Sequence, residues 1–210
     1  MIRNFKALGL ALIAVFALSA VAASAASASG ELFHSSAKPT SIVAKSESNQ
    51  VFVATATITC TGGEFTGTAS ESTQSSLTVH PVYTGCESSL GGNPSTVTTE
   101  GCNYIFQSEV PAGGHAKIEI ECEAGKFITI DNSLCTIKIG SQTVGQGVTY
   151  TSINSKKEVT VNATATKIKI AEKTGSLCFL VGAEGTYAGT SIVKGFEDKS
   201  GGAQVSVWWE

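Results

Sequence analysis

The sequence predicts an all-β protein: a single antiparallel β-sandwich stapled by disulfides, with a β-barrel as the alternative. From residue 41 to 210, apolar and polar residues alternate with a period of two, and the runs end at Gly, Asn, Asp, Ser or Pro. Such half-apolar strands suit antiparallel sheets, because parallel strands are usually apolar on both faces. The same region holds six cysteines, an even number that predicts three disulfides. Alternation alone does not distinguish a sandwich from a barrel.

Individual strands are predicted where the alternation is clearest. Residues 51–60 form one expected strand, whose apolar side chains share a face that we expect to be buried. In residues 117–123, isoleucines alternate with charged residues, which indicates a strand with one solvated face. Residues 159–165 alternate in the same way, and the pattern continues at Ile168 and Ile170. Shorter strands are expected at 77–83, 104–107, 127–130, 136–139, 148–151, 186–193 and 204–209.

The first 28 residues are predicted to be a signal peptide of bacterial type. Two basic residues precede an apolar run at 7–18, and the small residues that follow allow cleavage after Ala25 or Ala28. A membrane anchor is the alternative, but the run is shorter than the roughly 20 residues needed to span a bilayer. We therefore expect a secreted, extracellular or cell-envelope protein with no membrane span after cleavage.

The remaining chain is predicted to form one domain at 41–210, preceded by a flexible N-terminal segment at 29–40. No linker-like stretch divides the domain. The Ser/Thr-rich residues 69–76 are expected to be mobile, and a turn is expected at Gly62-Gly63.

The cysteines allow several disulfide patterns. They are Cys60, Cys86, Cys102, Cys122, Cys135 and Cys178. Six cysteines permit 15 pairings, among which sequence alone does not choose. Their spacing favours Cys86 with Cys102, across a Gly-Gly-Asn-Pro turn. It also favours Cys122 with Cys135, across a hairpin-like segment, and this leaves Cys60 for Cys178. Structural zinc is disfavoured because the chain has neither a CxxC pair nor a Cys/His cluster.

Composition and motifs argue against several classes of function. Charged residues make up 15% of the chain and the formal net charge is −3, so there is no basic surface for a nucleic-acid partner. With three histidines and no GxSxG, HExxH or P-loop motif, the sequence shows no catalytic apparatus. We expect no enzymatic activity, no catalytic residue, no cofactor and no metal.

Two features nevertheless suggest sites. Glu119, Glu121 and Glu123 line one strand face, where paired acids could serve a carboxylate-based hydrolase or hold calcium. The simpler interpretation is a solvated face beside lysines. Near the C-terminus, the parity of an extended strand turns Trp209 inward and Trp208 outward, so Trp208 is a candidate ligand contact.

An aromatic-x-Gly-Thr sequence occurs twice, at 65–68 and 187–190. The simpler interpretation is that glycine lets a neighbouring aromatic ring lie over the backbone in two strands. A duplication of two half-sandwiches is the alternative, although the spacing from the preceding cysteine differs between the copies.

The segments HPVYTGC at 80–86 and TEGCNYIF at 99–106 are followed by Cys122, Cys135 and a Cys-to-Tyr-x-Gly stretch at 178–189. In this pattern the chain resembles a set of uncharacterised secreted, cysteine-containing all-β proteins of high-GC actinobacteria. The resemblance covers most of the chain beyond the signal peptide. It implies export and an all-β fold, and because the set has no assigned activity it implies no function.

The sequence therefore predicts a secreted, non-catalytic extracellular or cell-envelope protein that presents loops to an extracellular glycan or a protein partner. A carboxylate-based extracellular hydrolase is one alternative. A purely structural or inhibitory module is another, in which a disulfide-bound loop at 87–101 would protrude toward its partner.

Overall fold

The computed structural model describes residues 31–210 except 55, 92–93, 109–114 and 198–201, with side chains also left out at 145–146. The predicted signal peptide at 1–28 lies outside these residues. The elements, in chain order, are β1 (Phe33–Ser35), β2 (Thr40–Ser46), β3 (Gln50–Ala54), β4 (Ala56–Ala69), β5 (Thr73–Gln74), β6 (Ser76–Ser88), β7 (Pro94–Thr98), β8 (Cys102–Gln107), β9 (Ala116–Cys122), β10 (Ile128–Asn132), β11 (Cys135–Ile139), β12 (Gln142–Ile153), β13 (Glu158–Lys169), β14 (Glu172–Thr174), the 3₁₀ turn η1 (Cys178–Leu180), β15 (Glu184–Phe196), β16 (Gln204–Val205) and β17 (Val207–Trp209).

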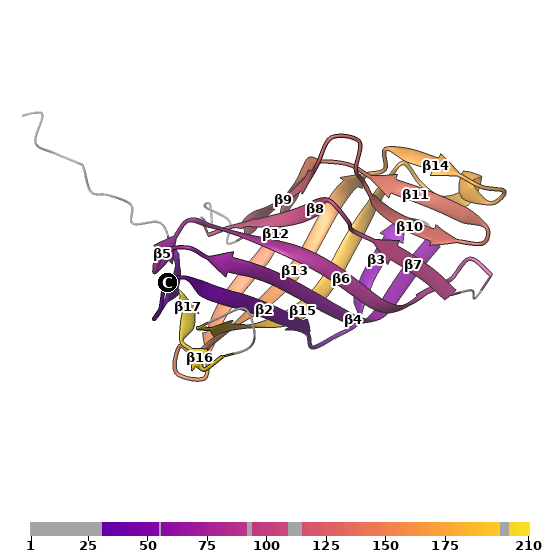
Figure 1. Ribbon diagram of the computed structural model, residues 1–210. Coiled ribbons are helices and arrows are strands. Elements are labelled where there is room, and N and C mark those ends of the chain that lie inside the picture. The colour runs from indigo at the N-terminus through magenta and orange to yellow at the C-terminus, as the bar shows by residue number, and fades with distance from the viewer. Residues whose placement is uncertain (1–30, 55, 92–93, 109–114, 198–201) are drawn as a thin grey trace, which may run out of the picture. The chain divides into compact units, whose positions relative to one another are not determined.

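Most strands belong to one antiparallel sheet of 14 strands, folded so that two layers face each other (Figure 1). Strand β4 pairs with β2 and β3 along one edge and with β6 along the other, so pairing runs from β6 through β8, β9, β12, β13, β15, β2 and β4 back to β6. A branch of β7, β10, β11 and β14 leaves at β6 and ends at β14. Although β4 also pairs with β6, the branch leaves the sheet with an unpaired edge at β14 among the described residues. The sheet as a whole is therefore sandwich-like rather than a closed barrel, which confirms the predicted antiparallel sandwich.

A small sheet of order β17-β1-β5 covers one end of the two layers (Figure 1). In it the chain ends pair with each other, since the Leu32 amide donates to the Glu210 carbonyl at 2.6 Å and the Glu210 amide donates back at 3.2 Å. Phe33 and Trp209 both pack on Tyr150, with ring centroids 5.0 and 5.5 Å away. The segment at 29–40, expected to be flexible, thus contributes β1 and the first residue of β2.

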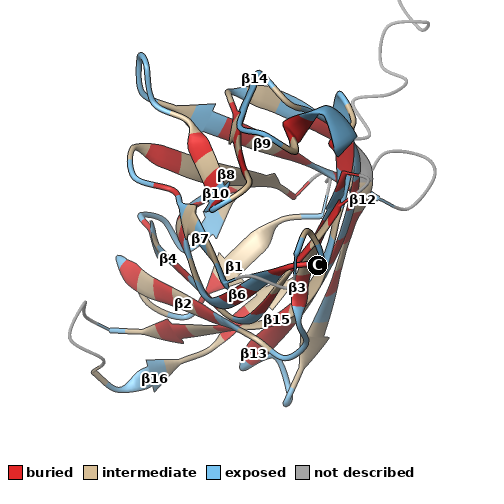
Figure 2. Cartoon of the chain, turned by 90° about the vertical axis from the view of Figure 1, so that its right-hand side faces the viewer, coloured by how far each residue is buried: buried red, intermediate tan, exposed pale blue. Residues whose placement is uncertain are grey.

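The core lies between the layers. Buried and exposed positions alternate along the strands (Figure 2), so each strand turns its apolar face inward. One buried cluster centres on residues such as Phe52, Ile130 and Ile137, and a second includes Ile42 and Phe65. Three tyrosines, from β6, β8 and β15, pack against both clusters and form the boundary between them: Tyr83, Tyr104 and Tyr187.

The strand expected at 51–60 is two strands. Residue 55 lies outside the described part, and β3 and β4 pair on either side of it with Ala54 opposite Ala56. A tight reversal keeps such partners on the same face, so the apolar residues of the run are buried as predicted. The turn expected at Gly62-Gly63 is also wrong, because both glycines lie inside β4, where Gly62 is paired with Thr84.

The strand expected at 204–209 is also divided, into β16 of the large sheet and β17 of the small one, whereas the other strand predictions hold. The strand expected at 117–123 is β9, with Ile118 and Ile120 buried and Lys117 exposed. Strand β13 carries a register shift between Ala165 and Ile168, and this irregularity lets Ile168 point inward after the preceding alternation.

All six cysteines form disulfides, but the pairing favoured by their spacing is wrong. The bonds are Cys60–Cys86, Cys102–Cys122 and Cys135–Cys178. The first two join residues directly opposite each other in the β4–β6 and β8–β9 pairs, with Cα atoms 3.9 and 4.0 Å apart. Strand register therefore sets the pairing: Cys86 and Cys102 lie on the paired strands β6 and β8 but are not opposite each other, and Cys122 and Cys135 lie on strands that do not pair. Such bonds indicate folding in an oxidising environment.

Candidate functional site

A cavity of about 130 Å³ lies between the two layers. Its wall is mainly aliphatic and aromatic, with side chains drawn from both buried clusters. The principal polar groups in its middle are Gln50 and the three tyrosines at the cluster boundary. We call these four side chains, Gln50, Tyr83, Tyr104 and Tyr187, the tyrosine belt.

Hydrogen bonds join the side chains of the belt in two pairs, Tyr83 with Tyr104 and Tyr187 with Gln50. The hydroxyls of Tyr83 and Tyr104 are 3.0 Å apart, and the Tyr187 hydroxyl also lies next to that of Tyr83. Tyr187 donates to the Gln50 side-chain carbonyl. The Gln50 amide nitrogen donates to the backbone carbonyls of Ser48 at 2.9 Å and, more weakly, of Thr190 at 3.3 Å. The Tyr187–Gln50 pair is thus connected to the backbone through the Gln50 amide, while the Tyr83–Tyr104 pair lies beside it in the cavity wall.

Local sequence explains how Gln50 reaches the belt. It opens β3 directly after the break that separates β3 from β2, and β15 runs alongside. A Cβ atom at Gly189 would lie 2.6 Å from the Gln50 side-chain carbonyl carbon, so only glycine leaves room there. The second aromatic-x-Gly sequence, Tyr187 to Gly189, therefore supplies one hydroxyl of the belt and the space for its amide partner.

Burial keeps the tyrosine hydroxyls protonated. It raises the pKa of Tyr104 to about 12, and burial is also the largest of the effects that raise the pKa of Tyr83 and Tyr187. At neutral pH the belt therefore presents neutral hydroxyls, which donate and accept hydrogen bonds but do not act as bases.

The cavity reaches the surface at the end covered by the small sheet. There its lining includes Phe33, His34 and Trp208, together with the exposed Glu71. Glu71 is paired with Lys38 at 3.3 Å. Side chains at this end are more polar than elsewhere in the wall.

Trp208, the ligand contact predicted from sequence, lies at this end. Its ring stacks on His34 at 5.2 Å with an interplanar angle of 9°, and its indole N–H donates to Glu210 at 3.0 Å. Trp209 packs inward against the second cluster, as parity predicted, and its indole N–H donates to the Ser108 carbonyl at 3.3 Å. Whether Trp208 contacts a ligand stays a prediction.

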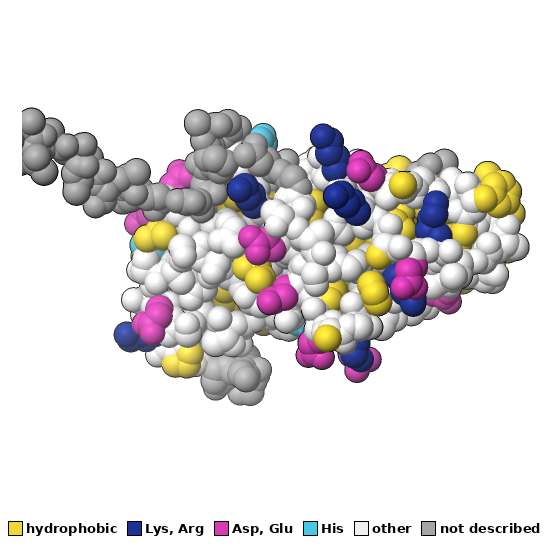
Figure 3. Space-filling model, turned by 90° about the horizontal axis from the view of Figure 1, so that it is seen from above, with side chains coloured by type: hydrophobic (Ala, Val, Ile, Leu, Met, Phe, Trp, Pro, Cys, Tyr) yellow, Lys and Arg dark blue, Asp and Glu magenta, His cyan; other side chains and the backbone are white. Residues whose placement is uncertain are grey.

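A second feature, not predicted from the sequence, is an exposed apolar tip on η1. The side chains of Phe179 and Leu180 are 75% and 43% exposed. Hydrophobic side chains gather at the end of the domain where β14 and η1 lie in Figure 1 (Figure 3). Cys135–Cys178 fixes the base of the tip to β11, so this apolar pair is held away from the core.

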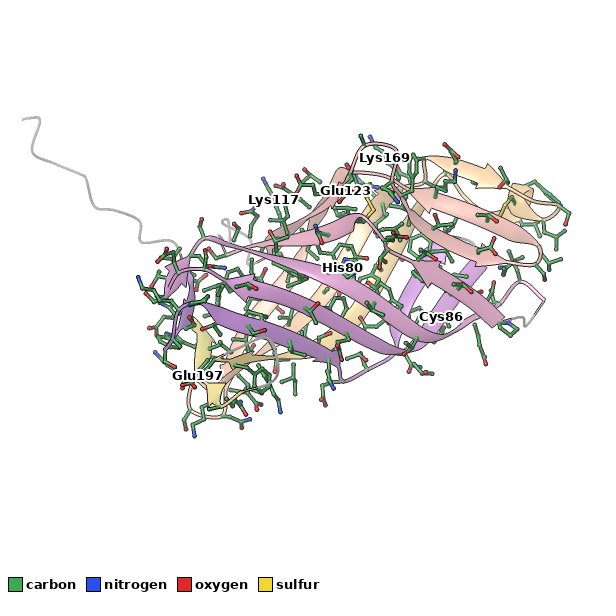
Figure 4. The ribbon with its side chains drawn as sticks, viewed as in Figure 1. His80, Cys86, Lys117, Glu123, Lys169 and Glu197 are labelled. Carbon is green, nitrogen blue, oxygen red and sulfur yellow. A yellow bond between two sulfur atoms is a disulfide. The ribbon has the colours of Figure 1, made fainter. Side chains whose placement is uncertain are left out.

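The acidic strand face is solvated. Glu119 and Glu121 alternate with buried isoleucines on β9, and Figure 4 labels Lys117 and Glu123 at the two ends of this strand. The cross-strand partners of Glu119 are Ile105 and Thr143, so no second carboxylate stands directly opposite it. These glutamates do not belong to the cavity wall.

His34 and His80 lie apart and have separate partners. His34 stacks on Trp208, while His80 Nδ1 lies 3.2 Å from the Cys102 carbonyl in the middle of β6 (Figure 4). Among the described residues, no group of three or more His, Cys, Asp or Glu side chains is placed to hold a metal ion.

The interior site escapes sequence reasoning because its tyrosines occupy inward positions of alternating strands, where they look like ordinary core residues. The detectable signal was Gln50, a long polar residue in phase with the buried Phe52 and Ala54. An inward-facing glutamine needs buried partners, and this requirement predicts a polar cluster inside the sandwich.

Comparisons with known proteins add no family. No protein-family model, no curated protein and no solved structure matches the chain. In the part of the chain that the structure describes, no helix is long and apolar enough to cross a membrane.

Proposed function

We propose that this chain is an exported, non-catalytic protein of the extracellular space or cell envelope that binds a small apolar molecule between the layers of its sandwich. The observation that carries the proposal is the cavity of about 130 Å³, with its largely apolar wall. The predicted leader and the three disulfides support export. The resemblance of the sequence to secreted actinobacterial proteins also supports export.

The size of the cavity indicates the size of the ligand. An engineered cavity of roughly 150 Å³ lined by Leu, Ile and Phe stays dry and binds benzene. The present cavity is close to that volume and has similar walls, so a single aromatic ring fits it. A ligand of six or seven heavy atoms is expected to bind with a dissociation constant on the order of 0.1–1 mM.

The non-catalytic part of the proposal rests on the chemistry of the wall. The tyrosine belt is neutral at pH 7, and the acidic face of β9 lies outside the cavity. An activity screen against glycosides would contradict this part if hydrolysis were found and were lost in Glu119→Gln.

The test of ligand binding is a titration of the purified, oxidised protein with toluene. Tryptophan emission is the readout, because Trp208 lies at the open end of the cavity. Ala163, buried opposite Gly189, lines the cavity, and Ala163→Leu is expected to fill it and to weaken binding at least tenfold. Ala188→Leu makes the same change at an exposed position of β15 and should leave binding intact. No saturable response in the wild-type protein would overturn the proposal.

The exposed tip on η1 favours a second candidate, a protein partner, which is one of the ligands expected from the sequence. Exposed aromatic and aliphatic side chains on a rigid turn are suited to fill a pocket on a partner. A pull-down from native envelope should recover a partner that Phe179→Ser loses and that Val82→Ser, at another exposed apolar position, retains. Equal recovery with both variants would exclude the tip as the contact.

The loop at 87–101, expected to protrude in a structural or inhibitory module, is integrated in the sheet. Its strand β7 pairs with β6 and β10, and residues 92–93 at its turn lie outside the described part. The structure therefore offers this alternative less support than the cavity offers ligand binding.

A further inference from the structure

Resting on the proposed function, we infer that the cavity selects an unbranched aliphatic chain that ends in one uncharged polar group, of which a linear primary alcohol is the simplest example. The inference follows from the length and width of the cavity and from the charges along its wall.

The cavity is long. Its wall includes Ile58 and Ala69 on β4, and Val159 and Ile168 on β13. Since a strand rises about 3.3 Å per residue, the two residues on each strand lie roughly 30 Å apart. Both strands run between the small sheet and the branch of the large sheet (Figure 1). The cavity therefore extends along most of the sandwich, from one buried cluster into the other.

The cavity is also narrow, because its volume of about 130 Å³ is distributed over this length. Large side chains line it, among them Phe52, Phe65 and Phe106. An unbranched chain of methylene groups is thinner than a saturated ring with the same number of atoms. The chain can follow a narrow cavity, whereas the saturated ring must displace the wall, and close-packed interiors resist displacement. A flat aromatic ring such as that of toluene is thinner than a saturated ring but fills only part of the length.

The polar side chains in the middle of the cavity do not require a polar ligand. The Tyr83 and Tyr104 hydroxyls are hydrogen-bonded to each other, and Tyr187 donates to the Gln50 side-chain carbonyl. The Gln50 amide nitrogen donates to two backbone carbonyls. Each of these side chains already has a partner, so an apolar chain can lie beside them without breaking a hydrogen bond.

The wall favours a polar end that is uncharged. Polar side chains line the cavity at the small sheet, where His34, Glu71 and Gln74 lie. Among the described residues, the wall contains no lysine or arginine. The neighbouring Lys38 is already paired with the carboxylate of Glu71. An anionic group would therefore lose its hydration without gaining an unpaired lysine, whereas a hydroxyl group can form hydrogen bonds with these polar side chains.

The experiment compares 1-hexanol, cyclohexanol and toluene, which have the same number of heavy atoms, by isothermal titration calorimetry on the purified, oxidised protein. 1-Hexanol should bind about tenfold more tightly than cyclohexanol, because the saturated ring overpacks the wall. From 1-butanol to 1-hexanol, each added methylene should raise the affinity about fourfold, which is the effect of burying one CH₂ group. Hexanoate at pH 7 should bind at least about tenfold more weakly than 1-hexanol, because its charge is buried without a partner.

The width of the cavity is tested with Val79→Ala. Val79 is buried and lines the cavity from β6, so the loss of its two methyl groups widens the cavity there. Cyclohexanol should then bind within about threefold of 1-hexanol. The matched control is Val82→Ala, which makes the same change at an exposed position of the same strand and should keep the preference for the chain.

Equal binding of 1-hexanol and cyclohexanol, or a preference that survives Val79→Ala, would overturn the inference. Hexanoate that binds as tightly as 1-hexanol would also overturn it. In each of these cases, continued binding of toluene leaves the proposed function standing. Failure of all the ligands to bind would overturn the proposed function itself. If thermal melts show that Val79→Ala does not fold, the comparison of the ligands on the wild-type protein still decides.

Discussion

At the scale of single residues, Gln50 shows how one side chain connects packing to the site. It is 2% exposed, yet all of its polar atoms are hydrogen-bonded. Leaving such an amide unsatisfied would cost roughly 1–3 kcal/mol, so the position of Gln50 is strongly constrained. That constraint passes to Gly189, which must stay small for Gln50 to lie where it does.

Gly189→Ala is therefore expected to displace Gln50 and to lower the free energy of unfolding by about 1–3 kcal/mol. Urea denaturation of the oxidised protein measures this change. Gly140→Ala is the control, because a Cβ there would meet only the Phe127 ring at an ordinary 3.5 Å. Similar losses in the two variants would contradict the role given to Gly189.

Glu158 makes the stability of the folded protein depend on pH in the acidic range. Burial alone would raise the pKa of this carboxyl, but hydrogen bonds from Lys194, Gln204 and Asn154 outweigh burial and hold the pKa below its ordinary value. Because the folded-state pKa is the lower one, this stabilisation is complete above the unfolded-state pKa and is lost as pH falls through the folded-state value.

Glu158→Gln should accordingly flatten the loss of stability below about pH 4.5, the ordinary carboxyl range. Thermal melts from pH 7 to pH 3 test this expectation. Some slope should remain, because hydrogen bonds from Lys156 and Trp208 also lower the pKa of Glu210. An unchanged slope in Glu158→Gln would show that the folded state does not hold this carboxyl ionised.

At the scale of strands, the alternation of apolar and polar residues predicted which strand faces are buried better than it predicted chain reversals and disulfide pairing. It placed Ile118 and Ile120 in the core correctly, because burial of one face fixes strand register. It missed the reversal between β3 and β4, because paired residues such as Ala54 and Ala56 keep the same phase as residues along one strand. The Cys60–Cys86 disulfide was missed for a related reason. The two cysteines are equidistant in sequence from Thr73, which lies in the connection between β4 and β6. Composition marks this connection as mobile, although it contains the short strand β5.

Each disulfide also makes a measurable contribution to the free energy of unfolding. Replacing Cys102 and Cys122 together by alanine is expected to cost about 3 kcal/mol on the loop-entropy model, and replacing Cys135 and Cys178 about 4 kcal/mol, because the second loop is longer. Guanidinium denaturation of the two double variants gives both values.

The second double variant should in addition free η1. Exchange of the Val181 amide, which is bonded to the Cys178 carbonyl, should accelerate in that variant and not in the first. Equal exchange in both would contradict the assignment of Cys135–Cys178 as the tether of the tip.

At the scale of the whole domain, the two ends of the described chain pair with each other and cover one end of the sandwich. Strand β1 and strand β17 pair residue by residue, and Trp209 packs into the second cluster. Trp209→Ala should lower the free energy of unfolding by roughly 2–4 kcal/mol, since it removes a large core contact. Trp208→Ala removes a half-exposed ring and should cost clearly less. A reversed order in thermal melts would contradict the inward placement of Trp209.

The order of the disulfides along the chain has a consequence for biogenesis. Each bond joins a cysteine to the next one in sequence, so the three loops follow one another without overlap. A chain threaded through a pore amino end first would present the two partners of each bond consecutively. An oxidase that couples every newly emerged thiol to the unpaired one before it would produce the native set with no need for an isomerase.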